Sequence, residues 1–404
     1  MAISSKMTAL ERRAAITLAG IFGLRLFGMF VVLPVFAIFA AGLPGGDDLR
    51  LVGLAVGAYG LTQALLQLPF GWWSDKVGRK PVIYAGLMIF AAGSFLAAMA
   101  DNIYVVIFGR ALQGAGAISA VVIALVSDLT RDEQRPKAMA VIGSAIGAMF
   151  VLSLVIGPWL APKIGVSGLF ALTGFLALVA FLVAWRIVPD PPAVPKVSTP
   201  GIQMILETLR NRQLQRLNFG IFSLHAVLTA LFIVIPFALR DAGIPVEAQW
   251  KIYLPVMLGS FVLMLIPVMQ SSSPVAMMRW FRISVALLLL LHVLLPWMVS
   301  NILWLAVFLV GFFTAFNVLE AKLPALVSRL APAGARGTAT GIYSTVQFLG
   351  SFAGATAAGF LYTVGQVKGV VIFDAVLLAI WLILSFGQAG AVTTPPQAAR
   401  QHAN

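Results

Sequence analysis

The stretch Gly71-Trp-Trp-Ser-Asp-Lys-Val-Gly-Arg-Lys-Pro81 places four charged residues between two long apolar segments, residues 50–71 and 82–100. Each segment has about 20 residues, the length that an α-helix needs to cross the hydrocarbon core of a bilayer. The glycines allow close backbone approach, and Pro81 suits the first turn of a helix. The stretch is therefore interpreted as a short polar turn between two membrane-spanning helices.

The composition of the whole chain favours a helical membrane protein. Its 404 residues are 60% hydrophobic and only 10% charged, against about 25% charged residues in an ordinary soluble domain. The mean hydropathy is +0.99. A soluble fold is excluded, and the continuous apolar runs differ from the alternating segments of about 10 residues that form β-barrels. The chain has no cysteine, which excludes disulfides, thiol catalysis and cysteine-based metal sites.

The apolar runs predict an all-α protein with twelve spans in two groups of six. Between the groups lies Val188-Pro-Asp-Pro-Pro-Ala-Val-Pro-Lys-Val-Ser-Thr-Pro200, whose five prolines prevent a continuous helix. We expect an N-terminal bundle (1–188), a cytoplasmic linker (189–213) and a C-terminal bundle with a short tail (214–404). The linker ends in a basic amphipathic stretch that fits either the membrane surface or a solvated helix. The expected spans are 14–40, 50–71, 82–100, 104–127, 138–161, 165–188, 214–239, 248–270, 280–299, 301–327, 337–361 and 367–388.

The net charge of +13 is concentrated in the short segments between spans. With the N-terminus inside, 19 of the 27 lysines and arginines lie on the cytoplasmic side, 5 lie outside and 3 lie within spans. This asymmetry follows the positive-inside rule and predicts that both termini are cytoplasmic. No basic stretch has interleaved aromatic residues, so nucleic acid is not an expected partner.

The fifth span of each half is rich in small residues, which let helix backbones approach closely in lipid. We therefore expect both spans to lie in packed interfaces. The residues are Gly143, Ser144, Gly147 and Gly157 in the first half, and Gly337, Gly341, Gly350, Gly354 and Gly359 in the second.

Three segments resemble the major facilitator superfamily of transporters. The spacing Gly-x-x-x-Asp-x-x-Gly-Arg-Lys between Gly71 and Lys80 resembles the loop signature of that family. The stretch Arg110-Ala-Leu-Gln-Gly-Ala-Gly-Ala117 resembles the motif that carries its intramembrane arginine, and Gly157-Pro158 resembles the core of its antiporter motif. Over residues 14–388 the chain is similar to the proton-coupled drug-antiporter branch and, within it, to the YajR-type inner-membrane transporters.

Two features depart from that pattern. In the antiporter motif, the expected glycine four positions before Gly157 is Ser153, and the closing glycine pair is Ala161-Pro162. The sequence also ends soon after the twelfth span, so we expect no soluble C-terminal domain of the kind that YajR-type members can carry. The likeness to antiporters is therefore weaker than the likeness to the superfamily.

The resemblance implies twelve helices in two six-helix bundles, a central cavity, and alternating access by rocking of the halves. It also implies a set of charges, called here the charge lock, that holds the halves together at the cytoplasmic face in the outward-open state. Exposed ion pairs of little energetic weight are the alternative interpretation. The charge lock comprises Asp75, Arg79, Asp128 and Arg336, supported by the signature glycines Gly71 and Gly78.

Ionisable residues within the spans are the next candidates, because a charge at the bilayer centre costs at least about 2.5 kcal/mol. Glu320 in the tenth span is the preferred proton or substrate carboxylate, and Asn317 shares its helix face. Arg25 faces either the cavity or the interface, and Arg110, by its family likeness, is a candidate modulator of proton affinity. Lys322 points away from Glu320 on an ideal helix, so we expect it to snorkel to the interface.

Polar residues four positions apart share a helix face and could line a cavity, although hydrogen bonds between adjacent helices explain them equally well. His225 is the next candidate for proton transfer, whereas the lone residues His292 and Asp374 are expected to be structural. The two polar pairs are Gln63 with Gln67 and Tyr343 with Gln347.

We therefore expect a secondary transporter of a bacterial-type inner membrane that exports small hydrophobic or cationic compounds in exchange for protons. The sequence has no nucleotide-binding loop or hydrolase motif, so an enzyme is not expected. Protons are the expected coupling ion, with no other cofactor and no metal site. Lipid and the substrate are the expected partners, with no obligate protein partner. Uptake of a metabolite or of copper is the first alternative, and a non-transporting membrane receptor is the second.

Overall fold

The computed structural model describes residues 6–190, 202–271, 273–332 and 334–387, and these residues form helices without any strand. All elements of the first half precede residue 190. They are α1 (Ala9–Phe30), α2 (Leu33–Ala40), α3 (Leu49–Val77), α4 (Arg79–Ala98), α5 (Ile103–Ala115), α6 (Ser119–Asp128) and α7 (Arg135–Arg186).

The second half begins inside the predicted linker, where a short helix precedes the next spans. Its elements are α8 (Ile202–Arg210), α9 (Arg212–Asp241), the 3₁₀ helix η1 (Val246–Ala248), α10 (Trp250–Met269), α11 (Pro274–Met298), α12 (Ile302–Leu330) and α13 (Arg336–Phe386). Residues 191–201 of the predicted linker, and the tail after residue 387, lie outside the described residues.

Twelve spans follow from the helix lengths. Ten helical segments of the described chain are long and apolar enough to cross a membrane, and two of them have 52 and 51 residues. At 1.5 Å per residue, such helices would be about 78 Å long, far beyond the hydrocarbon thickness of about 30 Å. Each contains one residue with non-helical dihedrals, Gly165 (φ 71°) in α7 and Gln366 (φ 49°) in α13. Each is therefore two spans joined at a sharp bend.

Two spans that we expected to be continuous, 14–40 and 104–127, are interrupted in the structure. The first is divided into α1 and α2 just before Pro34, whose ring nitrogen cannot donate the hydrogen bond of a continuous helix. The fourth is divided into α5 and α6 at Gly116, where α4 approaches closely. A Cβ atom on Gly116 would lie 2.3 Å from the carbonyl oxygen of Gly86. The helix is thus interrupted at the point where the backbones of Gly116 and Gly86 are in close contact.

We predicted a polar turn over residues 71–81, but the turn in the structure is much shorter. Helix α3 continues to Val77 and α4 begins at Arg79, so only Gly78 separates the two helices. Gly78 has a φ of 99°, a conformation that side chains with a Cβ rarely adopt. The charges of the stretch therefore lie on two helix ends and not on a loop.

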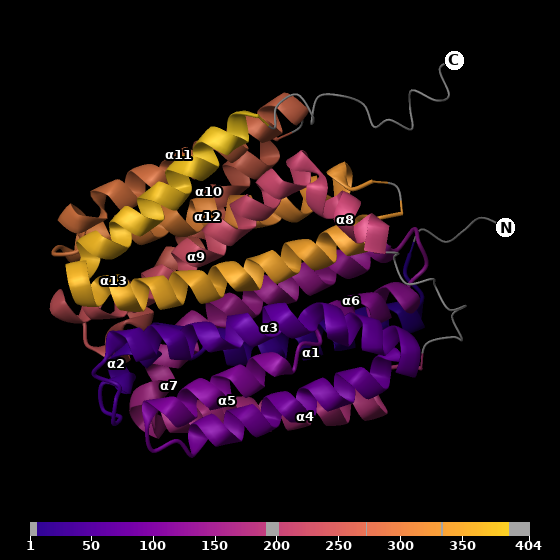
Figure 1. The fold of residues 1–404 in the computed structure, drawn as a ribbon, viewed down its shortest axis with the longest axis horizontal. Helices are drawn as coiled ribbons and strands as arrows, with labels where there is room; N and C mark the ends of the chain where they lie inside the picture. The colour runs from indigo at the N-terminus through magenta and orange to yellow at the C-terminus, as the bar shows by residue number, and fades with distance from the viewer. Residues whose placement is uncertain (1–5, 191–201, 272, 333, 388–404) are drawn as a thin grey trace.

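The two halves lie side by side as two bundles that meet along α3 and α13 (Figure 1). Small residues allow this contact, since a Cβ atom on Gly53 would lie 2.4 Å from the carbonyl oxygen of Ala355. We call the end where α1 begins and α13 finishes the terminal end. At the other end, called the opposite end, α2 contacts α9 and η1 contacts α7.

As we expected, the glycine-rich fifth spans lie in packed interfaces, although only over part of their length. Gly157 contacts the first span, with a hypothetical Cβ 2.4 Å from the carbonyl oxygen of Val31, and Gly354 closely approaches Ala226. In contrast, Cβ atoms on Gly143, Gly147 or Gly337 would contact nothing within 4 Å. The starts of α7 and α13, near the terminal end, are therefore less closely packed than their middles.

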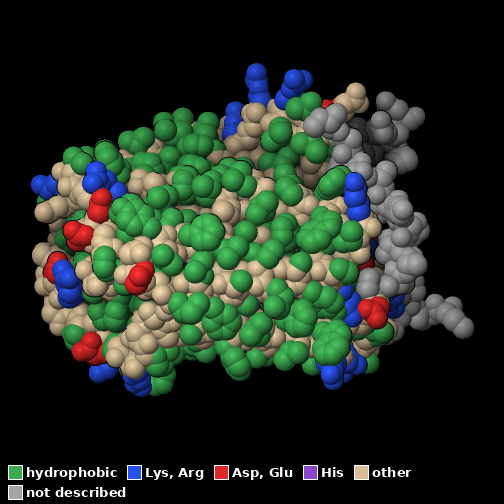
Figure 2. All heavy atoms as spheres, turned by 60° about the horizontal axis from the view of Figure 1, so that its bottom comes forward, with side chains coloured by type: hydrophobic (Ala, Val, Ile, Leu, Met, Phe, Trp, Pro, Cys, Tyr) green, Lys and Arg blue, Asp and Glu red, His purple; other side chains and the backbone are tan. Residues whose placement is uncertain are grey.

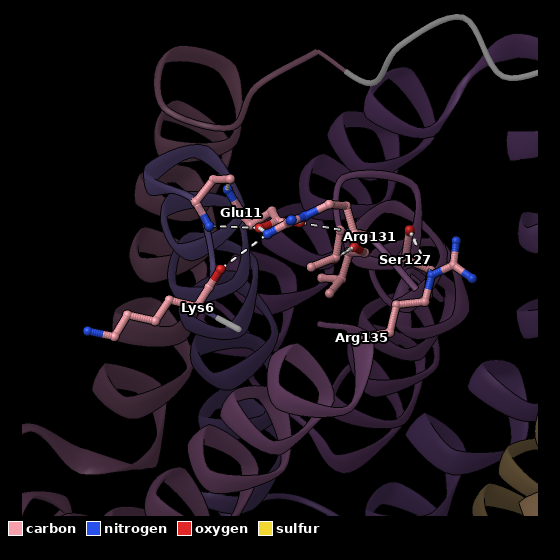
Figure 3. A network of polar contacts seen from close by, with 8 residues as sticks. Lys6, Glu11, Ser127, Arg131 and Arg135 are labelled. Carbon is pink, nitrogen blue, oxygen red and sulfur yellow. Dashed lines mark hydrogen bonds and ion pairs between the residues drawn. The ribbon is translucent and has the colours of Figure 1, made fainter. Parts of the chain in front are cut away.

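Hydrophobic side chains cover the middle of the molecule, and Lys, Arg, Asp and Glu gather towards its two ends (Figure 2). This distribution matches a protein whose middle is surrounded by lipid. At the terminal end, the buried carboxylate of Glu11 accepts hydrogen bonds from the Nε and Nη2 atoms of Arg131, at 2.8 and 3.0 Å (Figure 3). This ion pair fastens the start of α1 to the loop between α6 and α7, and it raises the pKa of Arg131 above its usual value.

Candidate functional site

Glu320 of α12 lies in a polar group with His225 of α9 and Gln347 of α13. The Gln347 amide nitrogen is 2.8 Å from His225 Nε2 and 3.5 Å from Glu320 Oε1. Glu320 Oε2 lies 4.0 Å from His225 Nε2 and has no hydrogen-bond partner among the described residues. The Glu320 side chain is 34% exposed, whereas that of His225 is 7% exposed. The structure thus brings together three predicted residues from three helices.

Tyr343 and Asn317 border this group without completing it. Tyr343 is buried on the same helix as Gln347, and its hydroxyl has no hydrogen-bond partner in the described chain. Asn317 donates a long hydrogen bond of 3.4 Å to Ser260 of α10 and forms no hydrogen bond with Glu320 in the described residues. Lys322, expected to snorkel, is instead buried and donates to the Ser271 hydroxyl at the end of α10.

Aromatic rings connect this group to the first half. The Phe316 ring centroid lies 5.8 Å from that of His225 and 6.2 Å from that of Phe150 of α7. Phe150 also lies 5.9 Å from Phe313 and 4.9 Å from Phe30 of α1. Because Phe316 and Glu320 are four residues apart, they share the face of α12 that is directed at the first half. Glu320 therefore lies at the junction of the two bundles.

Arg25 of α1 is the centre of a polar group in the first half. It is 4% exposed, and it donates hydrogen bonds to Ser119 Oγ at 2.8 Å and to the Gln63 side-chain oxygen. The Gln63 amide nitrogen in turn donates to Gln67 Oε1 at 2.9 Å. The two glutamines, for which cavity lining and hydrogen bonding were both left open, are buried and hydrogen-bonded to each other.

Arg110 of α5 belongs to the same region. It is 3% exposed and donates to Gln113 Oε1 at 2.9 Å. The Tyr59 ring of α3 lies between the two arginines, with its centroid 5.0 Å from Arg110 Cζ and 5.9 Å from Arg25 Cζ. Neither guanidinium forms an ion pair with any carboxylate of the described residues. Tyr59 was not among the predicted site residues, although it lies four residues before Gln63 and eight before Gln67, on the same helix face.

The charge lock is assembled only in part. Arg79 Nε lies 3.1 Å from Asp128 Oδ2, and the Arg79 guanidinium also contacts the Asp75 carboxylate. Gly71 accepts a hydrogen bond from Ser74, which in turn accepts one from Arg79. The expected contact with Arg336 is not formed within the described residues. Asp75 is paired instead with Arg79, which begins the next helix after the break at Gly78. All the contacts of the lock seen here lie within the first half.

The second half contains another carboxylate and imidazole, which the sequence analysis treated as unrelated. His292 Nε2 of α11 lies 3.8 Å from Asp374 Oδ2 of α13, and their side chains are 0% and 2% exposed. The other ring nitrogen of His292 contacts the Leu288 carbonyl oxygen at 2.8 Å. Their separation of 82 positions along the sequence gave no signal of this pairing. No group of three or more His, Asp or Glu residues suited to a metal occurs in the described ranges.

Comparisons with known proteins agree with this arrangement. The model of the Major Facilitator Superfamily matches residues 17–355. The inner membrane transport protein YajR of Escherichia coli is 41% identical over 394 residues, covering 97% of this chain and 86% of that protein. The quinolone resistance protein NorA of Staphylococcus aureus is 29% identical over 206 residues, half of each chain.

Solved structures show the same fold at low sequence identity. A bacterial homologue of the human lysosomal transporter Spinster, in an inward-facing and occupied conformation, gives a TM-score of 0.74 at 14% identity. That comparison covers 96% of this chain and 98% of the other. The human organic anion transporter MFSD10 gives a TM-score of 0.70 at 17% identity, with coverage of 94% and 100%.

Proposed function

Because the chain belongs to the major facilitator superfamily of transporters, we propose that it exports small hydrophobic or cationic compounds in exchange for protons. One observation carries this proposal. Glu320 lies at the junction of the halves with a partly exposed side chain and a buried, unpartnered Oε2 atom, and its only ion-pair neighbour in the described chain is a histidine. A carboxylate without a fixed cation can bind either a proton or a cationic compound, but not both together.

His225 and Gln347 provide a means to move that proton. The Gln347 amide group donates towards both His225 and Glu320 when the imidazole nitrogen that faces it is unprotonated. If His225 takes up a proton on that nitrogen, Gln347 must turn its oxygen towards the ring. The amide would then no longer donate to Glu320. Protonation of one group thus changes the hydrogen bonding of the other.

The aromatic rings beside Glu320 suit an apolar or cationic compound. Phe150, Phe313 and Phe316 come from both halves and form one aromatic cluster, in which Phe316 lies one helical turn before Glu320. The three side chains are buried, so a compound would reach them only after the halves move apart. Aromatic faces attract organic cations and apolar surfaces alike. The name of the Staphylococcus aureus relative, a quinolone resistance protein, is consistent with export of an aromatic compound.

Alternating access would require the halves to rock against each other. In this structure they meet at the opposite end and along α3 and α13, while the start of α7 is less closely packed. We therefore propose that this state is closed at the opposite end. Binding of a proton or a compound at Glu320 would bias the equilibrium between this state and the reverse one.

The test is compound-driven proton release from acid-loaded everted membrane vesicles, with a panel of hydrophobic and cationic compounds that includes quinolones. We expect proton release with the wild-type protein and none with Glu320→Gln. Glu247→Gln is the matched control, because Glu247 is exposed in η1 at the opposite end. Proton release that is unchanged in Glu320→Gln contradicts the role of Glu320. No response to any compound from folded wild-type protein would contradict export and favour uptake.

A further inference from the structure

A pocket of about 450 Å³ opens at the terminal end of the first half, away from Glu320. It lies between the start of α1, the start of α4 and the end of α7. The side chains that matter here are Leu10, Arg13, Lys80, Trp185, Arg186 and Asp190. Nothing in the proposed transport cycle uses this pocket.

The pocket has an excess of positive charge. Lys80 Nζ donates to Asp190 Oδ1 at 2.7 Å and to the Val188 carbonyl oxygen at 3.0 Å, so the acidic residue is already neutralised. Arg13 and Arg186 are exposed and form no ion pair with the described residues. Two guanidinium groups are therefore available to an anion, and a guanidinium binds phosphate oxygens through two parallel hydrogen bonds.

The apolar side chains of the pocket favour a lipid over a soluble anion as its ligand. Leu10 and Trp185 are 53% and 52% exposed beside the two arginines, and the Arg186 guanidinium lies 4.3 Å from the Trp185 ring centroid. Tryptophan and arginine are typical of the level of lipid headgroups. Free phosphate would use the guanidinium groups only and would leave these apolar side chains in water.

Exposed apolar residues continue from the pocket along the same helix faces. Ile16 lies three residues after Arg13 in α1 and is 58% exposed, and Leu182 lies four residues before Arg186 in α7 and is 53% exposed. These residues provide a path for acyl chains next to a cationic headgroup site. We propose that this pocket binds the phosphate headgroup of an anionic phospholipid, with its acyl chains along α1 and α7.

The test is lipid binding to the purified full-length protein, measured by native mass spectrometry with phosphatidylglycerol and phosphatidylethanolamine of identical acyl chains. We expect preferential binding of phosphatidylglycerol. The double variant Arg13→Gln/Arg186→Gln should weaken this binding by about thirtyfold. The matched control Arg12→Gln/Arg279→Gln removes the same charge from exposed positions outside the pocket, and it should retain the wild-type affinity.

Three results would overturn the proposal. The first is equal binding of the two lipids. The second is an equal loss of binding in the control variant, which would show a general charge effect. The third is full displacement of phosphatidylglycerol by inorganic phosphate, which would make the pocket a site for soluble anions. An unchanged circular dichroism spectrum and unfolding midpoint in detergent show that the double variant is folded, and this readout depends neither on the lipid measurement nor on the proposed transport function.

Discussion

The two halves share one fold, but apart from Glu11 near the terminal end and Lys322 in α12 they carry charged side chains of opposite sign within their spans. The first half holds Arg25 and Arg110, each bound to amide and hydroxyl oxygens and placed near the Tyr59 ring. The second half holds Glu320 and Asp374, each with a histidine as its only ion-pair neighbour in the described chain. None of these four groups is paired with a permanent ion of opposite sign in the described residues.

This difference separates the chemistry of the halves. A guanidinium group remains protonated in proteins, so the arginines of the first half provide fixed charge. A carboxylate beside an imidazole can gain or lose a proton at moderate cost. Proton exchange is therefore expected in the second half alone, although both halves must move during transport.

Exposure separates the two acidic sites of the second half. The Glu320 side chain is 34% exposed at the junction of the halves, whereas the Asp374 side chain is 2% exposed and its histidine is completely buried. A proton shared between His292 and Asp374 leaves that pair without net charge. We therefore propose that Glu320 exchanges protons and that Asp374 has a structural role.

The largest expected effect concerns His292 and Asp374, whose side chains are almost completely buried. His292→Leu would leave the Asp374 carboxylate without a partner, and we expect the free energy of unfolding to fall by about 3 kcal/mol. His225→Leu should cost less, because Glu320 is partly exposed and retains Gln347. Denaturant unfolding in detergent, followed by circular dichroism, measures both variants. An equal loss of free energy of unfolding in both variants would contradict the contrast between the partly exposed Glu320 and the buried Asp374. Recovery of stability in His292→Leu/Asp374→Leu would support it.

The next effect concerns the fixed charges of the first half. Tyr59→Leu removes the ring near both guanidinium groups, and we expect a loss of about 2 kcal/mol in the same unfolding measurement. Tyr59→Phe keeps the ring and removes a buried hydroxyl that has no hydrogen-bond partner in the described residues. It should therefore be as stable as the wild type. A large loss in Tyr59→Phe would show that the hydroxyl, and not the ring, holds this group together.

The architecture was predictable because length and hydropathy determine it. Apolar segments of about 20 residues identify membrane spans without knowledge of their partners, and this information sufficed for the all-α fold. The breaks at Pro34 and Gly116 were missed, because a break inside an apolar run leaves hydropathy unchanged. The extent of α3 was also misjudged, since charged residues at its end resemble those of a loop.

The candidate site was predictable residue by residue but not as an assembly. Glu320, His225 and Gln347 each stood out as polar residues in apolar spans. Their grouping depends on the packing of three helices, which no spacing within one helix reveals. The same reason explains why Tyr59 and the pairing of His292 with Asp374 were missed. The Arg336 contact was predicted from family likeness for the outward-open state, and it stays a prediction for that state, since Asp75 is paired within its own half here.

A smaller effect is expected at the charge lock. Asp128→Asn removes a contact of Arg79 in which both side chains are about one-fifth exposed, and it should lower the free energy of unfolding by about 1 kcal/mol or less. Asp75→Asn should cost less still, because the Asp75 side chain is 39% exposed. Unfolding measurements at low and high salt compare the two variants. The opposite order would contradict the assignment of Asp128 as the firmer partner.

The smallest effect is expected from neutralising a fixed charge. Arg25→Gln should leave the pH midpoint of compound-driven proton release unchanged, because no proton is exchanged in the first half. The transport rate can change in this variant, but the midpoint should not. Vesicle assays over a range of pH provide the measurement. A displaced midpoint would show that Arg25 is electrostatically coupled to the proton site, which would weaken the separation between the halves.

Infrared difference spectroscopy of the purified protein in lipid tests the central claim most directly, because it detects protonated carboxyl groups without a known substrate. Spectra recorded at acidic and alkaline pH should contain a carboxylic acid band that titrates. We predict that this band disappears in Glu320→Gln and remains in Asp374→Asn and Arg25→Gln. A titrating band that survives in Glu320→Gln, or disappears in Asp374→Asn, would contradict the assignment of the exchangeable proton to Glu320.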